Sequence, residues 1–488
     1  MITASINPWN HVHVESQDTE NHIAVYRRAI PPTSFTLMRP PFPLIRRARC
    51  LPLTRPHNRR RTLLTLAIET SCDDTSVAIL EKHKARSTLH FHDKVTSDNR
   101  AFQGVHPLVA LESHQKSLAL LVNRALQSLP ERPAESATWA NAIQIRGATE
   151  ESHTLRKRPD FITVTRGPGM QSNLMTGLDT AKGLAVAWQI PVLGVNHMQA
   201  HALTPRLVSS LSASSESAES HPQFPFLSLL VSGGNTMLVH SSDIVSHAIL
   251  AEKTDIPVGN VLDKCARDIL PKALLENGKS VMYGPMLEAF AFPNGAKDYD
   301  YTPPETQRGL NTMKTTQFGW AIRPPLSEDK SSSMEFSYSG LGAIIRRIVE
   351  GNPEMTDPER RLLAQETMRV AFEHLASRVL LALNTPAMKD ISTLVVSGGV
   401  ASNQFLKYML RSLLDKRGFG GVEVVFPPMS LCTDNAAMIA WTGMEMWEAG
   451  WRSGLDVRSL KKWGIDPGGG DGGIMGAEGW RRIDDTQL

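Results

Sequence analysis

The chain of 488 residues has 41% hydrophobic and 21% charged residues, the composition of a globular protein long enough for two folded lobes. Its four scattered cysteines (Cys50, Cys72, Cys265 and Cys432) have neither the density of a disulfide scaffold nor the paired spacing of a thiolate zinc site. No apolar run approaches the roughly 18 residues that span a bilayer, so we expect no membrane integration.

The formal net charge of +3 is unevenly distributed along the chain. Residues 1–62 contain ten arginines, no lysine and three acidic residues, whereas the remainder contains 42 basic and 46 acidic residues and has a net charge of −4. An Arg-rich leader that is poor in acids is typical of a mitochondrial presequence, although a disordered tail or a nucleic-acid-binding arm has a similar composition. The negative body predicts that any RNA binding depends on local basic patches.

The first α/β lobe is expected at residues 63–208. It begins with two apolar runs separated by the turn Glu69-Thr70-Ser71-Cys72-Asp73-Asp74, which predicts a β-hairpin with carboxylates and hydroxyls at its tip. The following elements are then expected in chain order: a helix at 106–126, a loop insertion at 130–159, a strand at 161–165, a sharp turn at 166–169, a helix at 173–188, a strand at 192–195 and a helix at 197–207.

A Ser-rich linker at 209–223 precedes the second expected lobe, at 224–426. This lobe also opens with a strand, a polar turn and a returning strand, which is weak evidence for a duplicated architecture. The later expectations are an irregular excursion at 291–334, helices at 340–349 and 358–383, a strand at 393–396, a helix from Asn403, a C-terminal helical segment at 427–462 and a disordered Gly-rich tail at 463–488. The alternation of strands and helices predicts α/β lobes with buried sheets.

Two Ser-Gly-Gly turns, at 232–234 and 397–399, each follow an expected strand. Glycine lets the backbone approach a bulky anion, and a helix N-terminus after the second turn would add partial positive charge. An ordinary tight turn explains either one alone, and neither matches the P-loop or the dinucleotide-binding fingerprint. Because the two turns occupy corresponding places in the two lobes, a nucleotide held between the lobes explains them as well as two ordinary turns do.

His197 and His201 are four residues apart, a spacing that places both imidazoles on one helix face and suits a shared metal ion. Two surface histidines explain the same spacing. A metalloprotease would carry a glutamate directly after the first histidine, and Met198 stands there instead, which disfavours protease chemistry.

Four aspartates lie in or beside the expected turns and helices, and each could have an ordinary structural role instead of a functional one. Considered by itself, Asp434 resembles the N-cap of the helix that follows it. Asp73 and Asp74 could hold a metal or orient a phosphate, but solvated turn acids are commoner. Asp263 could accept hydrogen bonds from a ribose or pair with Arg267 one helical turn further on.

Seven of these segments occur together in the order of one known family: residues 69–75, 167–169, the pair His197 and His201, 231–236, 339–341, 397–400 and 432–438. Over residues 63–450 the chain resembles the tRNA N6-adenosine threonylcarbamoyltransferase family, formerly described as O-sialoglycoprotein endopeptidases, in its mitochondrial branch. The resemblance implies a two-lobed actin/Hsp70/sugar-kinase-like fold with a nucleotide cleft between the lobes.

The resemblance also implies roles for single residues. The implied ligands of one divalent metal ion, iron or zinc, are His197, His201 and Asp434. Asp73 matches an acidic position close to the active centre. The positions that match the substrate contacts are Leu230, Val231, Ser232, Gly233, Gly234, Asp263, Gly284 and Asn403. The chain departs from the family pattern at Leu108, Gln199, Asn260 and Gly342.

The implied reaction transfers a threonylcarbamoyl group from threonylcarbamoyl-AMP, made by an upstream synthase, to N6 of adenosine 37 in the tRNA anticodon loop. The resemblance further implies a homodimer in the mitochondrial matrix. A kinase of the same fold would transfer phosphate from ATP and need no histidine pair. The four departures leave open a scaffold that binds tRNA or protein without catalysis.

Overall fold

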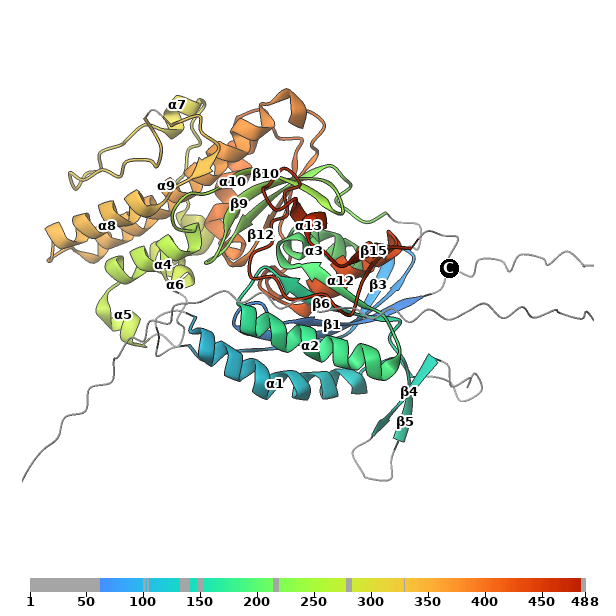
Figure 1. Cartoon of the computed structure of the whole chain (residues 1–488). Coiled ribbons are helices and arrows are strands. Elements are labelled where there is room, and N and C mark those ends of the chain that lie inside the picture. Colours follow the sequence, from blue (N-terminus) through green and yellow to red (C-terminus); the bar gives the residue numbers. More distant parts are fainter. Residues whose placement is uncertain are drawn as a thin grey trace, which may run out of the picture. The chain divides into compact units, whose positions relative to one another are not determined.

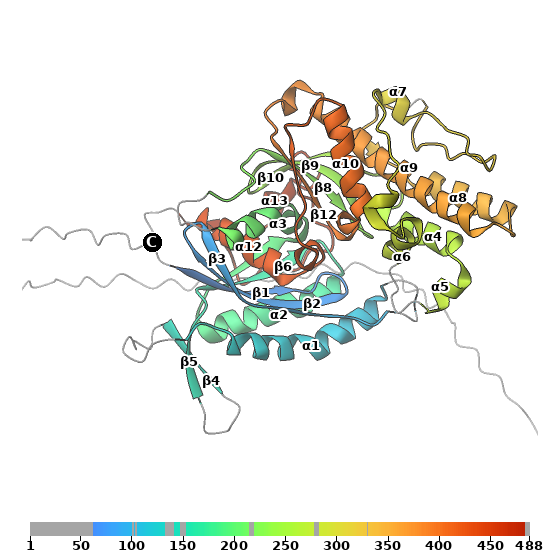
Figure 2. The ribbon, with the colours of Figure 1, turned by 180° about the vertical axis from the view of Figure 1, so that it is seen from behind.

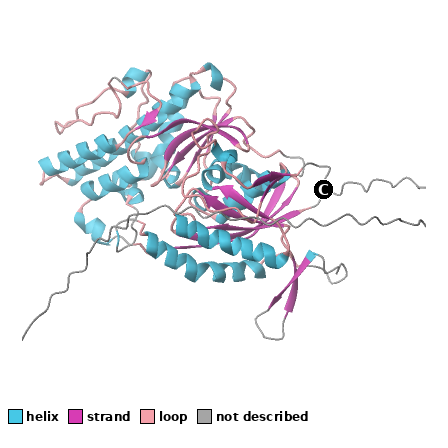
Figure 3. Ribbon diagram, viewed as in Figure 1, coloured by secondary structure: helices cyan, strands magenta, loops and turns pink. Residues whose placement is uncertain are grey.

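The computed structural model describes residues 62–99, 102, 105–131, 141–146, 153–213, 219–277, 283–328 and 330–483, and all of them lie in the unit of the chain that begins at Asn58. The Arg-rich leader expected at 1–62 lies outside the described residues, except for Thr62. Two large mixed sheets with helices against their faces, together with two small two-stranded sheets, form the described part (Figures 1 and 3). None of the helices in it is long and apolar enough to cross a membrane.

The sheet of the first lobe has the strand order β3-β2-β1-β6-β7. The first three strands are antiparallel neighbours, whereas β1 and β6, and then β6 and β7, are parallel. The predicted hairpin tip connects β1 to β2. The strands are β1 (Leu63–Glu69), β2 (Asp74–His83), β3 (Arg86–Thr96), β6 (Phe161–Gly167) and β7 (Val192–Asn196).

Helices cover both faces of this sheet because alternate residues of β1 point to opposite sides. Leu64, Leu66 and Ile68 pack with residues of α1 (Pro107–Gln127) and α2 (Gln171–Trp188), which lie side by side below the sheet in Figures 1 and 2. Ala67 packs on the other face with α3 (His197–Ser212) and α12 (Ala436–Glu448). The C-terminal helix α12 therefore completes the core of the first lobe.

The second lobe repeats this pattern. Its sheet has the order β11-β10-β9-β8-β12-β13, in which β8, β9 and β10 are antiparallel neighbours and β8, β12 and β13 are parallel neighbours. The two-lobed α/β fold of the actin/Hsp70/sugar-kinase type predicted from the sequence is confirmed. The strands are β8 (Phe226–Val231), β9 (Thr236–Asp243), β10 (Ser246–Lys253), β11 (Glu335–Phe336), β12 (Thr393–Ser397) and β13 (Glu423–Val425).

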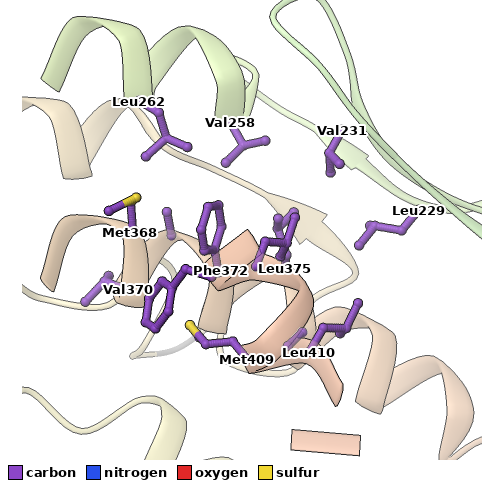
Figure 4. Packing of buried hydrophobic residues seen from close by; sticks show 14 of the residues in the cluster. Leu229, Val231, Val258, Leu262, Met368, Val370, Phe372, Leu375, Met409 and Leu410 are labelled. Atoms are coloured by element: carbon purple, nitrogen blue, oxygen red, sulfur yellow. The ribbon is translucent and has the colours of Figure 1, made fainter. Parts of the chain in front are cut away.

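A large apolar core joins the second sheet to its helices. Figure 4 shows Leu229 and Val231 of β8 facing Val258 of α4, with Phe372 and Leu375 of α9 close by. The helices of this lobe are α4 (Val258–Ile269), α5 (Lys272–Asn277), α6 (Gly284–Ala291), α7 (Gln307–Leu310), α8 (Ser339–Gly351), α9 (Asp357–Leu383) and α10 (Gln404–Lys416), with the 3-10 turns η4 (Gly295–Asp298), η5 (Pro386–Met388) and η6 (Gly399–Ser402).

Three segments differ from the sequence expectation. The insertion at 130–159 contains the hairpin of β4 (Ala142–Arg146) and β5 (His153–Lys157), and α3 extends to Ser212, into the expected linker. The tail was expected to be disordered from residue 463, but Trp463, Ile465 and Ile474 are buried against Leu230 and neighbouring residues. The C-terminal elements are α11 (Met429–Cys432), β14 (Trp451–Ser453), α13 (Gly473–Gly476) and β15 (Trp480–Arg482).

Candidate active site

Three predicted metal ligands meet in the structure. His197, His201 and Asp434 each offer a ligand atom, and these atoms lie within 4.8 Å of one another. The Nε2 atom of His201 lies 3.0 Å from Oδ1 of Asp434 and 3.2 Å from Nε2 of His197. The Nε2 atom of His197 is 3.4 Å from the same carboxylate oxygen. We call these three residues the His-His-Asp triad.

Two capping residues fix where the helices next to the triad begin. The side chain of Asn196 accepts hydrogen bonds from the backbone N–H groups of Met198 and Gln199, which starts α3 with His197 as its first residue. His201 follows one helical turn later. Asn435, not Asp434, is the N-cap of α12, because its side chain accepts from Met438 N. The carboxylate of Asp434 is therefore available to the histidines.

Glu69 contacts the triad through the Nδ1 atom of His197, on the opposite side of the imidazole ring from Nε2. Its Oε2 atom lies 3.2 Å from Nδ1 of His197, and Ser71 Oγ lies at the same distance from that nitrogen. Glu69 is fully buried and also accepts hydrogen bonds from Thr165 Oγ1 and from Ser71 N. A carboxylate that accepts the Nδ1 proton of His197 directs the lone pair of Nε2 toward His201 and Asp434.

The charges of these buried groups support one another. Burial lowers the pKa of His197, but the carboxylates of Asp434 and Glu69 outweigh that effect, so its pKa lies well above the usual value. Burial raises the pKa of Asp434, yet the charge of His197 and its hydrogen bond hold that pKa well below its usual range. The pKa of Glu69 is lowered in the same way, against the effect of burial, by the charge of His197. The site therefore stabilises positive charge beside the two carboxylates.

The triad fits a divalent cation of borderline softness. Two imidazole nitrogens and one carboxylate oxygen are a donor set for Fe(II) or Zn(II) that leaves coordination positions open. The hydrogen bond between His197 and Glu69 is the support commonly made by a metal-ligating histidine.

The first Ser-Gly-Gly turn closes the β8–β9 hairpin. The hydroxyl of Ser232 accepts hydrogen bonds from Asn235 N at 2.9 Å and from Gly234 N at 3.2 Å. Gly233 and Gly234 are exposed, and a Cβ built on either would meet no heavy atom within 4 Å. Small residues thus leave open space beside the backbone at this turn, as close approach of a ligand requires.

The turn after β12 packs against the first one. Gly398 has φ +99°, and a Cβ on it would lie 2.3 Å from the backbone oxygen of Val231. Both turns also contact α3: Ser397 Oγ donates to His201 O at 3.4 Å, and Asn235 Nδ2 lies 3.5 Å from the sulfur of Met198. The predicted nucleotide-binding turns and the triad therefore adjoin through α3.

Comparisons with known proteins decide the family. The family model described as tRNA N6-adenosine threonylcarbamoyltransferase matches residues 142–441. The mitochondrial tRNA N6-adenosine threonylcarbamoyltransferase of Schizosaccharomyces pombe is 35% identical over 90% of this chain and 93% of its own length. The corresponding enzymes of Maricaulis maris and Sinorhizobium medicae are each 31% identical and cover 85% and 82% of this chain, with 94% and 95% of their own lengths aligned.

The chain belongs to the tRNA N6-adenosine threonylcarbamoyltransferase family. It is accordingly an acyltransferase that forms threonylcarbamoyladenosine in tRNA. The family relationship favours this reaction over that of a kinase, which would share only the fold.

The acids of the β1–β2 turn are placed differently from one another. Asp74 is held by Lys94 at 2.7 Å and by Thr96 Oγ1, and Lys94 also contacts Thr433 Oγ1 at 3.0 Å. Asp73 is half-buried, and its pKa is raised by burial and by the charge of Asp74. Asp74 is therefore held by its hydrogen bonds, whereas the surroundings of Asp73 favour the neutral form of its carboxyl group.

The remaining candidate residues lie in the second lobe. Asp263 accepts a hydrogen bond from Gly284 N at 2.7 Å, so these two positions are in contact, and burial raises the pKa of Asp263. Asn403 is the N-cap of α10, because its Oδ1 accepts from Leu406 N at 2.8 Å. Its amide nitrogen faces the sulfur of Met368 at 3.7 Å.

The departures from the family pattern lie outside the triad. Leu108 is 69% exposed near the start of α1, and Asn260 is exposed on α4. Gln199 is buried beside the ligands and donates to Ile244 O at 2.7 Å. Gly342 lies where a Cβ would be 3.3 Å from Val261. None of the four is a residue of the His-His-Asp triad.

Glu69 is the residue that sequence reasoning did not assign. In the sequence it opens the polar turn after the first apolar run and begins the family segment at residues 69–75, without a role of its own. The available signal was a carboxylate at the end of a fully buried strand, since a buried charge requires partners.

Proposed function

We propose that the chain transfers the threonylcarbamoyl group of threonylcarbamoyl-AMP to N6 of adenosine 37 in mitochondrial tRNAs and releases AMP. The observation that carries the proposal is the convergence of His197, His201 and Asp434 beside the glycine turns of the second lobe. The arrangement sets a cation site next to backbone that can approach an anionic adenylate.

In this mechanism the adenosine amine attacks the carbamoyl carbon. A bond forms between N6 and that carbon, the bond between the carbon and the phosphate oxygen breaks, and AMP leaves with the electron pair. We assign Asp73 to receive the proton released from N6, which its raised pKa supports. The amine is a weak nucleophile, so positioning of both reactants supplies much of the rate.

The triad would hold one divalent ion, Fe(II) or Zn(II), which would supply Lewis-acid polarisation and orient the donor. Glu69 keeps His197 in the orientation that this requires.

The second lobe would bind the adenylate. We assign the donor phosphate to the backbone at Ser232, Gly233 and Gly234, after Leu230 and Val231 of β8. Asp263 would accept a hydrogen bond from the ribose, with Gly284 and Asn403 lining the nucleotide.

Partners and location follow from the chemistry and from the relatives. A synthase that activates threonine must supply the donor. The S. pombe relative is named as mitochondrial, and the chain begins with an Arg-rich leader; we therefore place it in the mitochondrial matrix. We further propose a homodimer.

The proposal is tested with purified full-length protein, threonylcarbamoyl-AMP and unmodified tRNA, followed by mass spectrometry of the nucleosides. We expect threonylcarbamoyladenosine with the wild type and a loss of at least about 10³-fold in rate for His197→Ala/His201→Ala, because a Lewis acid is worth several kcal/mol. Asp179→Asn, an exposed acid on α2, is the control. No product from the wild type, or full activity in the double variant, would reject the proposal.

A further inference from the structure

A short C-terminal segment, residues 457–466, is held against both lobes, and we call it the C-terminal strap. On the first lobe it binds the turn after β6: Leu460 N donates to Arg166 O at 2.8 Å, and Gly169 N donates to Lys461 O at 3.3 Å. Gln171 Nε2 donates to Ser459 Oγ at 2.7 Å. The sharp turn at 166–169, which the proposed reaction does not use, is therefore the seat of the strap.

The glycines of that turn permit two close approaches. A Cβ on Gly167 would lie 2.1 Å from the backbone oxygen of Leu460. A Cβ on Gly169 would lie 2.6 Å from the backbone oxygen of Ser71, whose hydroxyl is 3.2 Å from Nδ1 of His197. The turn at 166–169 therefore contacts the strap on one side and, on the other, Ser71, which lies beside His197 of the His-His-Asp triad.

The other end of the strap reaches α3 and the second lobe. Asn196 Nδ2 donates to Trp463 O at 3.3 Å, and Trp463 and Ile465 pack with Met198. Ile249 N, on β10, donates to Asp466 Oδ2 at 2.8 Å. The strap is thus anchored on both sides of its central residues.

Three basic side chains are displayed between these anchors. Val457, Ser459 and Trp463 are buried, whereas Arg458, Lys461 and Lys462 are exposed. Among the described residues, none of these three side chains forms an ion pair, and the acidic residue within the strap, Asp466, accepts a hydrogen bond from Ile249 N. Because the backbone of the strap is already fixed and its charged side chains point outward, binding a polyanion costs less conformational entropy.

We propose that Arg458, Lys461 and Lys462 bind the phosphate backbone of the tRNA anticodon arm and place the target adenosine at the triad. This inference rests on the proposed function. The chain beyond residue 62 has a net charge of −4, so RNA attraction has to come from a local basic surface. Contacts to phosphates fix the position of the RNA without reading its sequence.

The test compares Arg458→Gln/Lys461→Gln/Lys462→Gln with the wild type, in the full chain, by fluorescence anisotropy with labelled unmodified tRNA. Loss of three phosphate contacts should weaken binding about 10- to 50-fold at physiological salt and reduce the slope of log K against log salt by about 2. In activity assays the KM for tRNA should rise while the KM for threonylcarbamoyl-AMP is unchanged.

Two matched variants make the result decisive. Arg86→Gln/Lys272→Gln/Lys389→Gln removes one exposed arginine and two exposed lysines elsewhere and should bind tRNA like the wild type. Arg458→Lys/Lys461→Arg/Lys462→Arg keeps the charges and should retain affinity. Unchanged binding and salt slope in the strap variant, equal loss in the matched control, or a raised KM for the donor alone would overturn the inference. A wild type that binds tRNA but makes no product would instead reject the proposed function.

Discussion

The β1–β2 turn and the β8–β9 turn occupy the same position in the two lobes but have different chemistry. In each lobe the turn after the fourth strand of the shared pattern brings a glycine against the first hairpin: a Cβ on Gly169 would lie 2.6 Å from Ser71 O, and one on Gly398 would lie 2.3 Å from Val231 O. The first hairpin carries the buried carboxylate of Glu69, whereas the second carries exposed glycines. Under the proposed function, the first hairpin would support a cation and the second would approach an anion.

Of the substitutions in the two hairpin regions, Gly398→Ala should have the largest effect. The variant would combine a left-handed backbone with a contact far inside van der Waals distance, and we expect it to lower the free energy of unfolding by about 3 kcal/mol or more. Gly399→Ala is the matched control, because a Cβ there would meet no heavy atom within 4 Å. Urea unfolding measures both, and equal stabilities would show that the packed glycine is not required.

Glu69→Gln tests the role of the buried carboxylate in the first hairpin. The amide would keep the shape of the side chain but remove the negative charge beside Nδ1 of His197. We expect 10- to 100-fold weaker metal affinity, the typical cost of losing an outer-shell partner. Competition with a chromogenic chelator measures it, with Asp179→Asn as the control. Unchanged affinity would assign Glu69 to packing alone.

Local patterns predicted the parts of this site that lie within one stretch of chain. Hydrophobic periodicity and turn chemistry predict the hairpins and α3. The four-residue spacing of His197 and His201 then places both side chains on one face of α3. The approach of Asp434 to those histidines and the strap on Gly167 depend on contacts between residues more than 200 positions apart, which no local pattern encodes. The family resemblance supplied Asp434, but the position of the strap required the structure.

The tail shows why composition misled. Glycine, proline and aspartate between residues 464 and 476 predict disorder, yet Asp471 accepts hydrogen bonds from Gly464 N at 2.5 Å and Gly473 N at 3.1 Å. Such loops are ordered by their own side-chain acceptors. Trp463 and Ile474 then attach the loop to the second lobe.

Gly234→Ala tests the proposed phosphate contact at the β8–β9 turn. Of the three substitutions it should change the properties of the protein least. The free protein has space for a Cβ at this position, so its stability should stay within about 0.5 kcal/mol of the wild type. If the donor phosphate approaches this backbone, the added methyl group should raise the KM for threonylcarbamoyl-AMP about tenfold and leave the KM for tRNA unchanged. Gly351→Ala, at the end of α8 and equally open, is the control. An unchanged KM for the donor would remove the phosphate from this turn and leave the hairpin with a structural role only.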